Sequence, residues 1–179
     1  MTKADEQLYA DAVAKLGGKT VTNVFRPDVA FSHMVIGGQN PKNAKVALGI
    51  ARGAWIVSAD WITQCVEACE FADADEYEVN HLPGAAKARK TRKPLLSNLG
   101  FRVVGDTSPS PDELRCIIEA AGGRVVKTQS ESSICIASAQ ERARKRNLFA
   151  TAVLAEDKFT EALFNGVVPA LWIEGGTLV

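Results

Sequence analysis

The sequence has few of the residues that build catalytic centres. There are only two histidines, His33 and His81, and His33 lies in a run that predicts a buried strand. Neither histidine has the spacing of a metal site or of a catalytic triad. The Gly-Gly pairs do not extend to the GxGxxG pattern of a dinucleotide site. We therefore expect a protein that is not an enzyme and that needs no metal and no cofactor.

Net charge and long apolar runs are also lacking. Lys+Arg and Asp+Glu each total 21, so no overall field draws the chain to nucleic acid or to an anionic membrane. Charged residues interrupt residues 1–17, which excludes a signal peptide or a spanning helix there. We expect an intracellular folded protein with no membrane partner, and we take it to be a monomer.

Paired cysteine motifs are the third absence. The four cysteines contain no CxxC pair, and two of them lie one helical turn apart in an apolar stretch. Free thiols in such surroundings behave as small apolar side chains. We expect Cys65, Cys69, Cys116 and Cys135 to be reduced and to lie in the core.

The chain contains a repeat, in which equivalent residues are about one hundred positions apart. An apolar helical stripe ends at a Gly-Gly pair in each half, and an extended run that predicts a strand follows, at residues 19–21 and 124–126. The two stripes are Tyr9, Ala12, Val13 and Leu16, and Leu114, Ile117, Ile118 and Ala121.

The correspondence continues downstream of these strands. Residues 32–36 and 132–136 predict buried parallel strands, and residues 42–51 and 140–148 predict helices. A further strand, 55–57 or 152–154, then leads into a helix that carries Trp61 or Phe159, and Ser58 is a candidate N-cap for the first of these helices. This alternation predicts a parallel sheet with helices on both faces in each half.

A basic segment, residues 80–94, separates the halves. We interpret it as a solvated linker, with nuclear import or a phosphate contact as the alternatives. Its cations are Lys87, Arg89, Lys90, Arg92 and Lys93.

Three features together resemble the BRCT family: the glycine turn after Leu16, the stretch Leu48–Ser58 and the core residue Trp61. The resemblance implies an α/β fold with two BRCT-like repeats packed in tandem, each a small parallel four-stranded sheet flanked by helices. The repeats would be residues 1–79 and 95–179. Because the family places a strand before the first helix, the first strand of repeat 1 is expected to be truncated or to lie upstream.

The same resemblance implies a function. Tandem BRCT proteins recognise phosphoserine peptides in the nuclear DNA-damage response, so we expect an adaptor whose partner is a phosphorylated protein or histone tail peptide. The alternative is a phosphate-independent docking module or a DNA-binding module. A basic patch of Arg142, Arg144, Lys145 and Arg146 would serve DNA, as a secondary partner.

A phosphate reader needs a hydroxyl, a backbone N–H and a cation that converge on one point. By resemblance these are the Thr2 hydroxyl, the N–H of Lys3 and the Lys45 ammonium group. Lys42 lies three residues before Lys45 on the same helical face and would hold the peptide main chain or a terminal carboxylate. A lysine there supplies a point charge without the fork of an arginine.

Specificity in the family depends on a groove between the repeats that receives the side chain three residues after the phosphate. By resemblance Ala47 and the loop 107–111, with Ser108 and Pro109, would line this pocket. A small Ala47 would admit an aromatic side chain. Glu161 would lie nearby and oppose an acidic peptide terminus.

Overall fold

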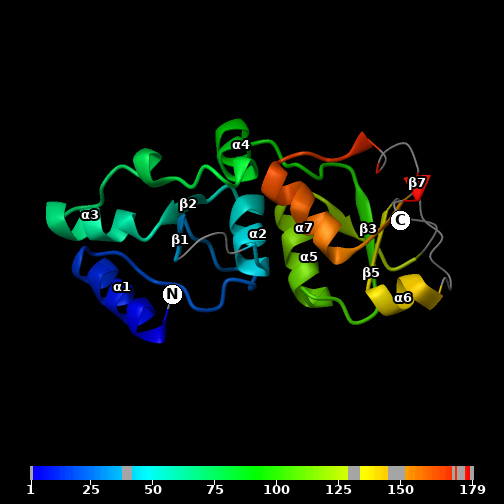
Figure 1. Ribbon diagram of the computed structural model, residues 1–179, viewed down its shortest axis with the longest axis horizontal. Coiled ribbons are helices and arrows are strands. Elements are labelled where there is room, and N and C mark those ends of the chain that lie inside the picture. The colour runs from blue at the N-terminus through cyan, green and yellow to red at the C-terminus, as the bar shows by residue number, and fades with distance from the viewer. Residues whose placement is uncertain are drawn as a thin grey trace.

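The computed structural model describes residues 2–37, 42–128, 134–144, 152–170 and 172, and the backbone of residues 176–177. The chain forms two α/β units arranged end to end, with α3 at one tip and β7 at the other (Figure 1). Helices α2, α5 and α7 lie between the units. The described residues include no helix long and apolar enough to span a membrane.

The first unit contains a short parallel sheet of β1 and β2, in which His33 lies opposite Trp55. Helices α1 and α3 pack against each other at its outer end. Its elements are α1 (Lys3–Lys15), β1 (His33–Ile36), α2 (Ala44–Ala51), β2 (Trp55–Ser58), α3 (Asp60–Ala68), the 3₁₀ turn η1 (Asp75–Tyr77) and α4 (Pro83–Thr91).

The second unit contains a parallel sheet in the order β4-β3-β5-β6-β7. Phe101, Phe159 and Trp172 are fully buried beside this sheet, and their rings lie 5.6 to 6.5 Å apart. Its elements are β3 (Gly100–Val104), α5 (Pro111–Ala120), β4 (Arg124–Val125), β5 (Ile134–Ala137), α6 (Ala139–Arg144), β6 (Ala152–Leu154), α7 (Glu156–Asn165) and β7 (Gly176–Thr177).

The predicted fold class is confirmed, but the strand counts differ from four in each repeat. Within the described residues the first sheet has two strands and the second has five. Residues 19–21 form no strand, whereas the equivalent run in the second half forms β4. In the second unit β3 lies between β4 and β5, and in the described part of the first unit β1 pairs with β2 alone.

One detail of a helix end was predicted wrongly. Ser58 does not cap α3: Ala59 precedes the helix without a side-chain cap, and the Ser58 hydroxyl bonds the Asp60 carboxylate at 3.3 Å. The helix expected over residues 140–148 is confirmed as α6 for residues 140–144, and residues 145–148 lie outside the described part.

The cysteines are all free, as expected. Their burial differs from the prediction, because Cys69 is exposed and Cys116 is only partly buried. Cys135 lies in β5, and burial raises the pKa of its thiol. No cluster of His, Cys, Asp or Glu suited to a metal ion occurs among the residues described.

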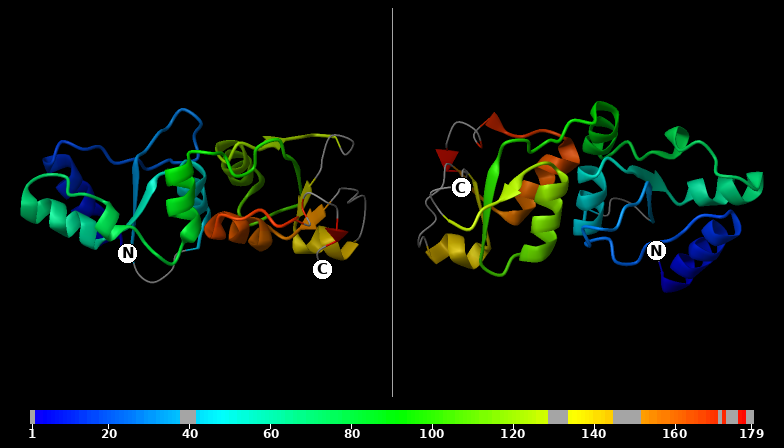
Figure 2. Two further views of the ribbon diagram at one scale, coloured as in Figure 1. Left: turned by 90° about the horizontal axis from the view of Figure 1, so that it is seen from above. Right: turned by 180° about the vertical axis from the view of Figure 1, so that it is seen from behind.

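The segment interpreted as a solvated linker is the helix α4, which packs against α2, β2 and α7. Gly84 and Ala85 are buried, and the Lys87 ammonium group donates to the Gly166 carbonyl at 2.7 Å. The interpretation was wrong because small residues of this helix admit close packing against its neighbours, and Lys87 and Arg89 contact α7 and β2 instead of water alone. Figure 2 shows α4 beside α2 where the two units meet.

A column of stacked rings attaches α4 to the first sheet. His33 stacks on Trp61 at 4.5 Å and on Trp55 at 6.4 Å, and the Arg89 guanidinium lies 3.2 Å from the centre of the Trp55 ring. Arg89 also pairs with the partly buried Glu78 at 2.6 Å. Burial lowers the pKa of His33, which favours the neutral ring within this column.

The two units share one apolar core. Leu48 and Ile50 of α2 are buried in the same cluster as Leu114 and Ile117 of α5 and Leu163 of α7. Full burial of one such side chain stabilises the fold by about 1.5–3 kcal/mol. Separating the units would expose several of these side chains to water at once, and their stabilisation would be lost. We infer that the units move as one body.

The approach of α4 to α7 gives a stability test. A methyl group at Gly84 would meet the backbone of residues 163–166, whereas one at Gly49 would meet only the ends of two flexible side chains. In a helix without such contacts, Gly→Ala stabilises by up to about 1 kcal/mol. We expect Gly84→Ala instead to destabilise by about 1–3 kcal/mol, and Gly49→Ala by less, in urea unfolding. Increased stability of Gly84→Ala would contradict this packing.

Candidate functional site

Thr2 and Lys3 lie at the amino end of α1. Thr2 is the N-cap: its side-chain oxygen accepts from the Asp5 N–H at 3.2 Å, and the Asp5 carboxylate accepts from the Thr2 N–H at 2.7 Å. This reciprocal capping box uses the Thr2 oxygen as an acceptor. The sequence interpretation missed this role, although Thr-x-x-Asp before an apolar stripe is a recognisable signal.

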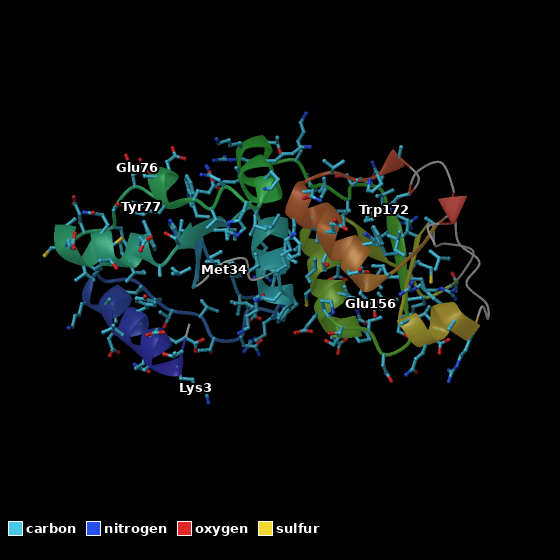
Figure 3. The ribbon with its side chains drawn as sticks, viewed as in Figure 1. Lys3, Met34, Glu76, Tyr77, Glu156 and Trp172 are labelled. Carbon is cyan, nitrogen blue, oxygen red and sulfur yellow. The ribbon has the colours of Figure 1, made fainter. Side chains whose placement is uncertain are left out.

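The helix end presents donors to an anion. The N–H of Lys3 is at the first helical position, where no carbonyl is available one turn earlier, and the positive end of the helix dipole lies there. The Lys3 side chain points away from the rest of the molecule (Figure 3). Asp5 opposes this effect: the hydrogen bonds from Thr2 hold its pKa below the ordinary value, so its carboxylate is charged beside the Thr2 hydroxyl.

Lys45 and Lys42 lie at the amino end of α2, which is capped by Asn43 at 3.1 Å to the Val46 N–H. Both lysines are exposed, and the described residues contain no carboxylate paired with either. The Lys42 ammonium group lies 5.9 Å from the centre of the Phe164 ring on α7. Lys42 therefore bridges the two units, and Phe164 is a neighbour that the sequence did not indicate.

The two helix ends are on one side of the molecule. Figure 1 shows the N-terminus and the end of α2 that lies away from α4 both toward the lower side of the molecule. The structure records no direct bond between Thr2 or Lys3 and Lys45 among the described residues, and α1 packs mainly against α3. The three expected phosphate ligands thus share a face without being in contact.

The residues expected to line the specificity pocket differ in their exposure to solvent. Ala47 is fully buried between the helices, so it does not line an open groove, which corrects that expectation. It faces the interface because α2 presents its apolar residues there. Ser108 is exposed and Pro109 partly buried in the loop before α5, and the Glu161 carboxylate pairs with Lys158 at 3.1 Å on exposed α7 surface.

The loop 107–111 has a structural role of its own. Ser110 caps α5 in a second capping box with Glu113. The Glu113 N–H donates to the Ser110 side-chain oxygen at 3.4 Å, and the Ser110 N–H donates to the Glu113 carboxylate at 2.9 Å. The side-chain oxygen of Thr107 is buried without a hydrogen-bond partner. Buried hydroxyl groups are normally bonded, so this oxygen is an exception.

Part of the basic patch proposed for DNA is neutralised. Arg144 pairs with Glu141 at 2.9 Å, whereas Arg142 donates to the uncharged Ala137 carbonyl of β5 at 3.2 Å. Lys145 and Arg146 lie outside the described residues. Of the two described arginines, Arg142 therefore keeps its full charge.

Known proteins share both the sequence pattern and the fold. Residues 1–66 match the family "BRCA1 C Terminus (BRCT) domain". Microcephalin of Colobus guereza is 28% identical over 147 residues, which is 76% of this chain and 17% of that protein. BRCA1-associated RING domain protein 1 of Arabidopsis thaliana is 26% identical over 145 residues, which is 73% of this chain and 20% of that protein.

Solved structures agree over nearly the whole chain. The BRCT5-BRCT6 domains of S. pombe Brc1 match with a TM-score of 0.68 and 15% identity, covering 94% of this chain and 91% of that one. The complex of Rtt107p with a phosphorylated histone matches with a TM-score of 0.61 and 12% identity, covering 91% and 82%. The chain spans a fifth or less of the curated relatives named above.

The fold and the shared helical interface define a tandem α/β repeat module. More particularly, residues 1–66 match the BRCT domain family, the chain as a whole has the tandem BRCT fold, and its sequence resembles microcephalin.

The Thr2 cap can be tested separately from any ligand. Removing its side-chain oxygen by Thr2→Ala leaves one N–H of α1 without a partner, so we expect a loss of about 1 kcal/mol in the free energy of unfolding. Thr2→Ser keeps the oxygen and should retain nearly all the stability. Chemical denaturation of the three proteins measures this, and equal stability of Thr2→Ala and the wild type would refute the capping role.

Proposed function

We propose that this chain is a phosphoserine-peptide recognition module of a nuclear DNA-damage-response protein, in which it acts as an adaptor that binds a phosphorylated protein or histone tail. The observation that carries the proposal is the set of groups on one side of repeat 1 that can bond a phosphate. These are the Thr2 hydroxyl, the Lys3 N–H and the Lys45 ammonium group.

The chemistry of these groups suits a phosphate. A phosphoserine carries close to two negative charges, so it gains from a helix amino end and from a mobile cation at the same time. Lys45 gives up no ion pair when it binds a ligand, because it is exposed and has no carboxylate partner among the described residues. In the proposed complex Lys45 swings toward the phosphate held at the end of α1.

The rest of the peptide would cross from repeat 1 to repeat 2. Lys42 lies over Phe164 and would meet the peptide main chain or its terminal carboxylate. The loop with Ser108 and Pro109, together with Glu161, would receive the following side chains. Support for a phosphorylated ligand comes from the neighbour Rtt107p, whose solved complex contains a phosphorylated histone.

The principal test is fluorescence-polarisation binding of a labelled peptide with the sequence Ser-Gln-Glu-Tyr, phosphorylated or not on serine. We expect binding only of the phosphorylated form, and a loss of at least about tenfold in affinity for Lys45→Met, because one charge-assisted bond to a phosphate is removed. Lys19→Met, which changes an exposed lysine elsewhere in repeat 1, should bind like the wild type.

Two results would reject the proposal. Equal binding of both peptides would indicate phosphate-independent docking. No peptide binding, together with duplex DNA binding that falls steeply with salt, would favour the DNA-binding alternative.

Asp5 supplies a second and opposite test. Its charged carboxylate lies beside the Thr2 hydroxyl, so it should repel a phosphate. Asp5→Asn keeps an acceptor for the Thr2 N–H and removes the charge. We expect the phosphopeptide affinity to rise by about threefold to tenfold, more at low salt than at high salt. Unchanged or weaker affinity at every salt concentration would place the phosphate away from α1.

A further inference from the structure

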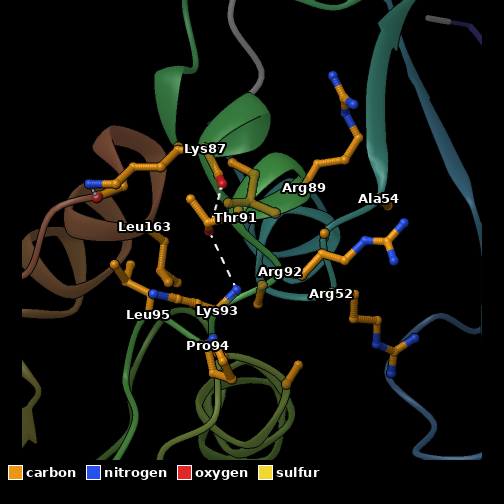
Figure 4. A pocket seen from close by; sticks show the side chains of 18 of the residues that line it. Arg52, Ala54, Lys87, Arg89, Thr91, Arg92, Lys93, Pro94, Leu95 and Leu163 are labelled. Atoms are coloured by element: carbon orange, nitrogen blue, oxygen red, sulfur yellow. Dashed lines mark hydrogen bonds between the residues drawn. The ribbon is translucent and has the colours of Figure 1, made fainter.

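A second groove lies at the other end of the helical interface. It has a volume of about 1010 Å³ and is formed by the carboxyl end of α2, by α4 and by the ends of α5 and α7. Figure 4 shows Arg52, Arg89, Arg92 and Lys93 around this hollow. Since α2 has eight residues, the groove is about 12 Å from the amino end that carries Lys45.

The charge of the groove is of one sign. Among the described residues its lining has no aspartate and no glutamate. The positive charge is therefore local, although the whole chain has equal numbers of basic and acidic residues. The cations of the lining come from the end of α2, from α4 and from the turn after α4, and they are Arg52, Lys87, Arg89, Lys90, Arg92 and Lys93.

Most of these charges are not neutralised. Arg89 is the exception, because it pairs with Glu78 and Asp75 at the edge of the groove. Arg52 and Lys87 donate to the uncharged carbonyls of Arg26 and Gly166, so each keeps its full charge.

The remaining three cations form the outer rim. Lys90, Arg92 and Lys93 are exposed, and none has a carboxylate partner in the part of the chain that the structure describes. Arg92 is held by the left-handed backbone that ends α4, with φ of 50°. This backbone turn brings Arg92 and Lys93 to the groove rather than onto a continued helix.

Apolar groups lie among the cations. The lining includes Ala51, Ala54, Leu95 and Leu163, together with Pro94. Grooves of this kind favour a ligand that has both apolar and charged groups, because apolar contact supplies affinity and the charges supply orientation and partner choice.

We propose that this groove is a second binding site, for an acidic segment of a partner protein in which carboxylates alternate with apolar side chains. An extended strand of such a peptide presents its apolar residues to the groove on one side and its carboxylates to the rim. The site is separate from the phosphate ligands at the other end of α2, so this inference does not rest on the proposed function.

Duplex DNA fits the groove less well. A specific DNA interface buries about 1,000–2,500 Å² and presents many cations on a projecting surface. Here the cations surround a hollow, and three of them line its rim. An acidic peptide chain is narrow enough to enter.

The test is fluorescence-polarisation binding of a labelled peptide in which glutamate and leucine alternate, with a glutamine-leucine peptide as the uncharged probe. We expect the acidic peptide to bind and the double variant Lys90→Glu/Lys93→Glu to bind it at least about tenfold more weakly. The variant Lys19→Glu/Lys127→Glu makes the same change in net charge at exposed lysines outside the groove, and it should bind like the wild type.

The outcomes separate this site from the phosphopeptide site. Lys45→Met should bind the acidic peptide normally, and Lys90→Glu/Lys93→Glu should bind the phosphopeptide normally. Equal loss in both double variants, binding of the uncharged peptide, or a preference for a short DNA duplex over the acidic peptide would each overturn the proposal.

Discussion

The packing of α2 against α5 and α7 is the contact on which the rest of the structure depends. Val46, Leu48 and Ile50 are almost completely buried there, and they connect the cores of both repeats. The described first sheet has only two strands, which is marginal for independent stability in water. Repeat 1 has a small buried cluster of its own around Trp61, and the rest of its core is shared with repeat 2 through α2.

This constraint also determines where ligands can bind. Because the middle of α2 is buried, only its two ends are open to partners. The amino end carries Lys42 and Lys45, and the carboxyl end carries Arg52. One helix therefore separates two basic surfaces, and both of them include residues of repeat 2. A single repeat would present neither surface in full.

The sequence predicted the elements that follow from the local spacing of apolar residues. The repeat, the helical stripes and the buried strands follow from the spacing of apolar residues, and α5 and β4 were found in this way. The burial of Ala47 and the packing of α4 depend on residues far away in the chain. A basic sequence with two buried small residues resembles a solvated linker until the partner helix is known. The residues of the candidate site could be proposed from their types alone, whereas the capping role of Thr2 is seen only in its bonds to Asp5.

The competition between capping and ligand binding at Thr2 limits how such a site can work. A capping box stabilises α1 through an acidic residue, and that same residue adds a negative charge where a phosphate would bind. The helix end attracts the anion, and Asp5 offsets part of this attraction. In the proposed complex, selective binding would depend on the cation at Lys45, because the end of α1 already carries the charged Asp5 carboxylate. The distance between α1 and α2 would then set the affinity, and the shared core behind α2 fixes the position of that helix.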